Sequence, residues 1–166
     1  MNTVPEAFFH AIPKVELHCH LLGTVRQDTF RELTQKAGAP ISDDEITAFY
    51  TRGEKPVGVL RVLRALDAWL LQTPDDLHRI TYEYLQDAAR HNVRYAEFFW
   101  NPTGTVRESG MSYAAAQGGI VRAIADAAAE RDPKEIARRC ATFVERSAAY
   151  ALQVLDAESP ASSQSN

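Results

Sequence analysis

The sequence predicts an α/β fold in which several helices accompany two parallel strands. Two short segments rich in apolar, β-branched or aromatic residues, 15–22 and 93–100, have strand character. The segments between them show the periodicity and the start signals of helices. A long helix that leads directly into a strand is the pattern of a βαβ unit. The composition, 45% hydrophobic and 24% charged, is that of a folded globular protein.

The first predicted strand lies between Pro13 and Gly23. Its short length and these flanking residues favour a buried strand over a helix. Because side chains alternate along a strand, we expect His18 and His20 on one face. Cys19 is then expected on the opposite face, packed between the strand and the helices.

Three helices are predicted before the long helix that precedes the second strand. The first runs over 28–36 and ends at Gly38. Ser42 and Glu45 have the spacing of a capping box and predict a short second helix. The third is amphipathic, because leucines recur at helical spacing between residues 60 and 71. Glycines and a proline within 51–58 predict a loop between the last two.

Strong start signals predict the long helix itself. Thr73 can cap it, and Pro74 loses no hydrogen bond at the first helical position. The helix ends near His91, and the second strand follows at 93–100. One apolar face is expected to be formed by Leu77, Ile80, Tyr84 and Ala88.

Beyond the second strand the sequence predicts helices over 112–131 and 132–156 and a disordered tail over 157–166. No third strand is predicted where a continuing α/β pattern requires one. We therefore divide the chain into an α/β part at 1–131, a C-terminal helix of undetermined origin and the tail. Gly118 and Gly119 cost the helix at 112–131 about 1 kcal/mol each against alanine, and we expect them to permit a close neighbour.

Charge and composition exclude several classes of partner. The net charge of −4 leaves no basic face for nucleic acid. No apolar run approaches the roughly 18 residues of a membrane span, and no signal peptide is recognisable. Cys19 and Cys140 lie far apart without CxxC spacing, so we expect reduced thiols and a cytoplasmic location.

The candidate chemistry lies in His18 and His20. Two neutral imidazoles on one side of a strand suit a borderline-soft ion such as Zn²⁺. The pair comes at the C-terminal end of its strand, which is where β/α barrels hold their active sites. An H-x-H pair by itself is more often structural or simply exposed, so the spacing leaves both interpretations open.

A longer motif surrounds this pair. Residues 13–21, Pro-Lys-Val-Glu-Leu-His-Cys-His-Leu, closely resemble the opening motif of the adenosine deaminases. Residues 92–97, Asn-Val-Arg-Tyr-Ala-Glu, resemble the second strand of that family, and the helices at 74–91 and from 112 onward are similar to its neighbouring helices. The likeness covers roughly residues 5–131.

This resemblance implies a zinc-dependent hydrolase of the amidohydrolase superfamily that deaminates adenosine or a related aminopurine. It implies the first two βα units of a (β/α)8 TIM barrel, since 166 residues are fewer than the roughly 250 of a complete barrel. His18 and His20 would be metal ligands, and His20 would also lie against the substrate, a small purine nucleoside or base. Leu22 stands where the best-known members have the aspartate that binds the ribose, so strict adenosine specificity is not expected.

The remaining family motifs are not found. No histidine follows His91, so the family's later histidines have no counterpart, and Ser42-Asp43-Asp44 reads as a helix cap rather than as the family's aspartate motif. We therefore assign no catalytic residue and expect a truncated enzyme that is inactive by itself. The alternative is a non-catalytic remnant that binds metal weakly or self-associates through exposed strand edges.

Other residues receive structural interpretations. Glu97, in an apolar strand, is expected to pair with an arginine or a backbone donor. Trp69 and Trp100 are expected to pack in the core.

Overall fold

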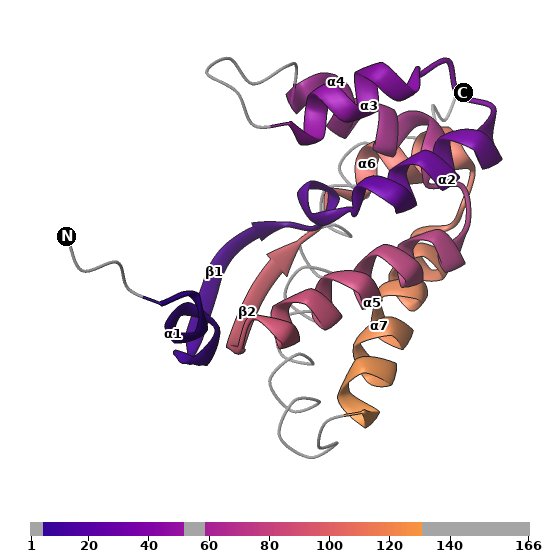
Figure 1. Ribbon diagram of the computed structural model, residues 1–166. Helices are drawn as coiled ribbons and strands as arrows, with labels where there is room; N and C mark the ends of the chain where they lie inside the picture. The colour runs from indigo at the N-terminus through magenta and orange to yellow at the C-terminus, as the bar shows by residue number, and fades with distance from the viewer. Residues whose placement is uncertain (1–4, 52–58, 131–166) are drawn as a thin grey trace, which may run out of the picture.

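A computed structural model describes residues 5–51 and 59–130 (Figure 1). The predicted loop at 51–58 lies almost entirely outside the described residues, as do Cys140, the helix predicted at 132–156 and the tail predicted at 157–166. The described elements are α1 (Glu6–Ala11), β1 (Lys14–His20), η1 (Leu21–Thr24), α2 (Gln27–Ala37), α3 (Asp43–Tyr50), α4 (Val59–Ala65), η2 (Leu66–Leu70), α5 (Pro74–Arg90), β2 (Val93–Phe99), α6 (Pro102–Ser109) and α7 (Tyr113–Ala129).

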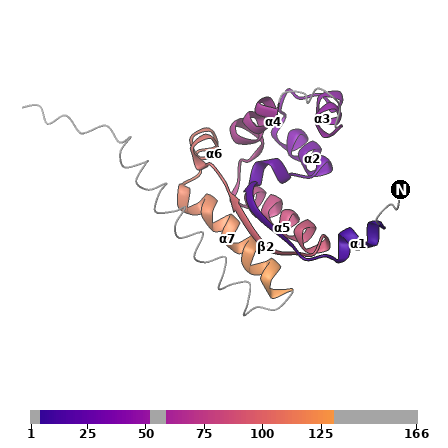
Figure 2. The same ribbon diagram turned by 90° about the vertical axis from the view of Figure 1, so that its left-hand side faces the viewer.

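Strands β1 and β2 form a two-stranded parallel sheet, as the sequence predicts. In this sheet Lys14 lies opposite Val93 at one end and His20 lies opposite Phe99 at the other. The carboxyl ends of the two strands are therefore side by side. Helix α5 lies along the sheet and α7 runs beside α5 (Figure 1). Helix α1 lies at the opposite end of the strands from α6 (Figure 2).

The predicted caps fix the helix starts. The Thr73 hydroxyl accepts a hydrogen bond from the Asp76 amide, and the Asp76 carboxylate accepts one from the Thr73 amide at 2.9 Å. Ser42 and Glu45 form the same reciprocal arrangement at α3. Gly38 ends α2 with φ +58°, in the left-handed region that glycine adopts without a Cβ penalty.

The core lies between the sheet and the helices that connect its strands. Its fully buried side chains are mostly leucine and isoleucine from η1, η2 and α5. Three of the four residues predicted on the inner face of α5 are buried, and Ala88 is partly exposed. The core cluster consists of Cys19, Leu21, Leu22, Val25, Phe30, Leu33, Ile46, Ala65, Leu66, Leu70, Leu71, Leu77, Ile80, Tyr84, Ala116, Ile120 and Ile124.

Helices α5 and α7 pack closely because α7 carries a glycine at the contact. A Cβ placed on Gly119 would lie 2.1 Å from the carbonyl oxygen of Pro74, whereas one on Gly118 would meet nothing within 4 Å. The expected close neighbour is therefore found at Gly119 alone. Polar contacts flank this packing: an ion pair joins Arg122 to Asp75 at 2.7 Å, and His78 Nε2 lies 2.8 Å from the Asp126 carboxylate.

Three features depart from the sequence predictions. Helices α1 and α6 lie where the sequence predicts none. Strand β1 ends at His20, and the next two predicted strand residues belong to the short 3-10 helix η1. Trp69, predicted in the core, is 50% exposed, because the helix predicted at 60–71 ends in the π-helical turn η2, which buries Leu66 and Leu70 instead. Trp100 does pack against the core.

Among the described residues, no helix is both long enough and apolar enough to cross a membrane.

Candidate functional site

The two histidines of the predicted site stand together at the C-terminal end of β1. Both are exposed, whereas Cys19 between them is only 7% exposed and joins the core, as strand alternation predicts. The centroids of the His18 and His20 rings are 5.4 Å apart, with the ring planes at 78°. Alternation of side chains thus places both imidazoles on one side of the strand, facing away from the helices that bury Cys19.

A third ring completes this arrangement from the neighbouring strand. Phe99, the register partner of His20, lies edge-to-face at 4.1 Å from His20 and 4.9 Å from His18, centroid to centroid. No motif in the sequence marks Phe99 as part of this site. Phe99 is the last residue of β2, as His20 is of β1. Because parallel strands of equal length that begin side by side also end side by side, these two residues become neighbours.

Strand β1 is held to α5 on its other face, where Glu16 lies because the strand register is irregular between Glu16 and Cys19. The Tyr84 hydroxyl donates a hydrogen bond to the Glu16 carboxylate at 2.6 Å. Burial, followed by that carboxylate, raises the pKa of Tyr84 well above its ordinary value, and burial also raises the pKa of the Cys19 thiol. The hydrogen bond between Tyr84 and Glu16 ties α5 to the strand from which the two imidazoles project.

Glu97 has a partner of a different kind from the one expected. The Tyr95 hydroxyl, two residues back on the same strand, donates a hydrogen bond to the Glu97 carboxylate at 2.5 Å. The structural interpretation of Glu97 therefore holds, with a tyrosine in place of an arginine or a backbone donor. Glu97 is partly exposed.

The geometry of the imidazole pair can be compared with that of a metal centre. Zinc binds imidazole nitrogen at about 2.0–2.1 Å in tetrahedral sites, which puts the centroids of two such rings about 5 Å apart. The observed 5.4 Å is close to this spacing, but so is the 5.4 Å between the nearly parallel rings of His10 and His91. The position at the carboxyl end of β1 distinguishes the first pair. Within 5–51 and 59–130, no group of three or more histidine, cysteine, aspartate or glutamate residues is placed to hold a metal. Among the described residues, His18 and His20 would therefore give a metal two of the four ligands of a tetrahedral site.

Leu22 follows the histidine pair within η1, where it is 8% exposed and belongs to the core cluster. An aliphatic side chain cannot accept a hydrogen bond, so this position offers nothing polar to a substrate. The turn is closed locally, since the Thr24 hydroxyl donates to the carbonyl of Leu21 at 2.8 Å.

Comparison with known proteins places this geometry in a family. Residues 13–157 match the family model described as adenosine deaminase. The match includes both strands and continues past residue 131, where the motif resemblance ends.

Individual relatives agree with that match. An adenosine deaminase of Clostridium perfringens is 35% identical over 96 residues, which cover 55% of this chain and 29% of the relative. A zinc-bound amidohydrolase from Burkholderia ambifaria is 67% identical with a TM-score of 0.73, over 78% of this chain and 36% of that one. An adenine deaminase from Arthrobacter aurescens is 26% identical with a TM-score of 0.59, over 72% and 37%. The chain thus spans about a third of the length of these relatives.

Proposed function

This chain belongs to the adenosine deaminase family, and from that premise we propose that it forms the first part of the active site of a zinc-dependent hydrolytic deaminase. Its fold is part of a (β/α)8 barrel, the first two βα units, with parallel strands whose carboxyl ends carry the site. The substrate would be adenosine or a related aminopurine. The single observation that carries the proposal is the pair of imidazoles at the end of β1.

In this proposal His18 and His20 bind the zinc ion through neutral ring nitrogens. A bound zinc ion lowers the pKa of a coordinated water to about 7, which supplies hydroxide near neutral pH. Phe99 of the neighbouring strand lies edge-to-face against both imidazoles. The bond between Glu16 and Tyr84 holds the same strand from its other face.

The substrate class follows from the purine chemistry of the family and from Leu22. His20 would lie against the substrate as well as binding zinc. Because Leu22 is buried and apolar, the ribose of a nucleoside gains no hydrogen bond at this position. A free aminopurine base has no ribose and so does not need this hydrogen bond. Both adenosine and adenine are therefore tested as substrates. Relatives of this chain bear both names, adenosine deaminase and adenine deaminase.

A second candidate function is a non-catalytic, self-associating protein that binds metal weakly. The observation that favours it is the exposure of Val15 (64%) and Leu17 (61%) on β1. Large apolar side chains on a strand of a two-stranded sheet invite pairing with another chain. Two imidazoles without further ligands would also release zinc readily to a chelator.

Zinc binding tests the proposed site. The 166-residue chain is titrated with Zn²⁺ against a chromogenic chelator, alongside His18→Ala, His20→Ala and the control His78→Ala, which removes a histidine of α5 that contacts Asp126. We expect one zinc per chain, with binding weakened at least about tenfold in each site variant and unchanged in the control. Equal binding by all four proteins would refute the site.

Measurements of deaminase activity and of molar mass in solution distinguish the deaminase from the self-associating protein. Adenosine and adenine are incubated with the zinc-loaded chain and followed by their ultraviolet absorbance. Turnover that is lost in His18→Ala supports a working deaminase, and zinc binding without turnover supports a partial site. Light scattering of the native chain and of Leu17→Lys tests the second function. A single monomeric mass for both proteins would contradict self-association through this strand.

A further inference from the structure

The zinc site proposed above has only two imidazoles within one copy of the chain. The sequence contains five histidines, and all of them lie within the described residues. His10 and His91 stack on each other near the amino ends of the strands, and His78 of α5 contacts α7. No other imidazole of the same copy is therefore placed to join His18 and His20, so further imidazole ligands have to come from another molecule.

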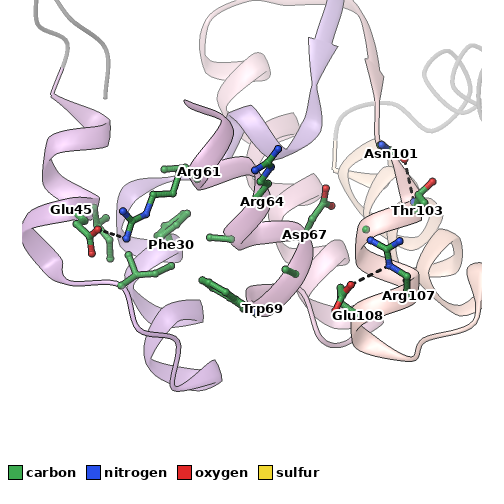
Figure 3. A pocket seen from close by; sticks show the side chains of 16 residues that line it. Phe30, Glu45, Arg61, Arg64, Asp67, Trp69, Asn101, Thr103, Arg107 and Glu108 are labelled. Carbon is green, nitrogen blue, oxygen red and sulfur yellow. Dashed lines mark hydrogen bonds and ion pairs between the residues drawn. The ribbon is translucent and has the colours of Figure 1, made fainter. Parts of the chain in front are cut away.

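The described carboxylates of the same copy do not complete the site either. Within 5–51 and 59–130, no aspartate, glutamate or cysteine joins the two histidines to form a group of three. The cavity of about 870 Å³ among α3, α4, η2 and α6, which Trp69 lines, has three carboxylates on its wall, but neither histidine borders it (Figure 3). Each of these carboxylates has a partner of its own: Glu45 with Arg61 at 2.6 Å, Asp67 with Thr105 at 2.8 Å and Glu108 with Arg107 at 3.1 Å.

A bulge in β1 places an apolar side chain beside the imidazoles. Leu17 and His18 together lie opposite the single residue Glu97 of β2, because the register shifts by one residue between Glu16 and Cys19. Both of those flanking residues face α5, so the two residues between them point to the side of the sheet away from this helix. The exposed side chains on that side form what we call the open face of β1: Val15, Leu17, His18 and His20.

We propose that two copies of this chain contact each other through the open face and share one zinc ion, held by His18 and His20 of each copy. The inference rests on the proposed zinc site, because it uses the same two imidazoles. Structural zinc sites are four-coordinate and tetrahedral, and a two-fold contact between identical faces supplies two identical pairs of ligands. Val15 and Leu17 provide the apolar contact around the ion, since neighbouring exposed apolar side chains mark protein interfaces.

The charge of the shared ion has a counterpart beside the open face. Neutral imidazoles leave the two positive charges of Zn²⁺ uncompensated. Glu97, opposite the bulge on β2, is partly exposed, and the Tyr95 hydroxyl donates a hydrogen bond to its carboxylate. One such carboxylate from each copy brings two negative charges to the contact. These charges attract the ion and repel each other without it, so the association depends on the metal.

The ratio of zinc to chain tests this proposal. The 166-residue chain, prepared without a histidine tag, is examined by sedimentation velocity in EDTA, with half an equivalent of Zn²⁺ and with a large excess. We expect a monomer in EDTA and a dimer at half an equivalent. In excess zinc we expect monomers again, because each pair of histidines then binds an ion of its own by mass action. That last state is the one zinc per chain expected in the titration above.

Two variants and a control identify the ligands. At half an equivalent of zinc, His18→Ala and His20→Ala should each dimerise at least about tenfold more weakly, because the ion loses two of its four imidazoles. His78→Ala keeps all four and should dimerise as the native chain does. Co²⁺ provides a second readout. Its visible absorption should be intense at half an equivalent, where four nitrogens impose a tetrahedral site, and should fall in excess metal. Circular dichroism verifies that each variant is folded.

Three outcomes would overturn this proposal, and they distinguish its failure from that of the proposed function. One zinc per chain with a monomeric mass at every ratio would refute the shared ion and leave the zinc site intact. No zinc binding at any ratio would refute the site and the shared ion together. A dimer that persists in EDTA, or that forms in His18→Ala and His20→Ala as in the native chain, would contradict the zinc link and support association without metal.

Discussion

The contact between α5 and α7 gives the sharpest test of the packing. Gly119→Ala places a methyl group 2.1 Å from the Pro74 carbonyl oxygen and 3.0 Å from its carbonyl carbon. Ordinary contacts begin near 3.4 Å, so one helix must move by more than 1 Å. The obstacle is backbone at the first turn of α5, beside the Thr73 cap, and it cannot rotate away as a side chain would. Overpacking of this kind costs about 1–3 kcal/mol.

Gly118→Ala is the matched control. Both substitutions gain the same intrinsic preference of alanine for a helix, about 1 kcal/mol, but a Cβ on Gly118 meets nothing within 4 Å. We therefore expect Gly118→Ala to stabilise the protein by about 1 kcal/mol. Because the helix term cancels between the two variants, the difference of about 1–3 kcal/mol between them measures the steric term alone.

Urea denaturation followed by circular dichroism measures this difference. With a slope of about 1–3 kcal/mol per molar urea, the two midpoints should differ by roughly 1 M, with Gly119→Ala unfolding first and similar slopes for both. Equal midpoints, or a Gly119→Ala protein more stable than Gly118→Ala, would show that α7 does not press against the start of α5.

Two further predictions concern the ends of α5. Thr73→Ala removes the hydroxyl that accepts a hydrogen bond from the Asp76 amide and should lower the free energy of unfolding by about 1 kcal/mol, measured by urea denaturation. The control Thr103→Ala removes an exposed threonine that caps no helix and should change stability little. Equal losses in the two variants would contradict the role of the cap. The hydrogen bond from Arg26 lowers the pKa of Asp87 in the folded protein below its ordinary 3.8. The ionised carboxylate therefore stabilises the fold above pH 3.8, and this stabilisation is lost as the pH falls through the lower pKa of the folded state. Asp87→Asn should therefore be less stable than the native chain at neutral pH and equal to it in strong acid, and a pH-independent difference would refute the pairing.

The shared side of His18 and His20 was predictable because the relevant information is local. Side-chain alternation fixes that His18 and His20 share a side of the strand, and the same alternation buries Cys19. Phe99 was not predicted, since its contact with both imidazoles depends on the register between strands more than 70 residues apart.

Helix α6 shows a signal that was present in the sequence but given another meaning. Asn101 and Pro102 follow directly on the strand predicted at 93–100, where they fit the end of a strand, yet they also cap and start α6, which ends at Gly110 with φ +71°. An asparagine cap, a proline at the first helical position and a glycine at the end of a helix each also occur in simple turns. The packing of Thr105 and Gly104 on Asp67 distinguishes the helix from a turn, and this contact joins distant parts of the chain.

The sequence by itself determined the two strands and the long helix between them, the starts of α3, α5 and α7 and the shared side of the two histidines. These features depend on hydrogen bonds and on side-chain periodicity within a few residues, so the local sequence is enough to specify them. Tertiary structure alone decided that Trp69 faces a cavity, that Leu22 is buried and that Phe99 meets both imidazoles. Each of these depends on which distant surface covers a side chain, and that is set by the free energy of packing the whole fold rather than by any one segment.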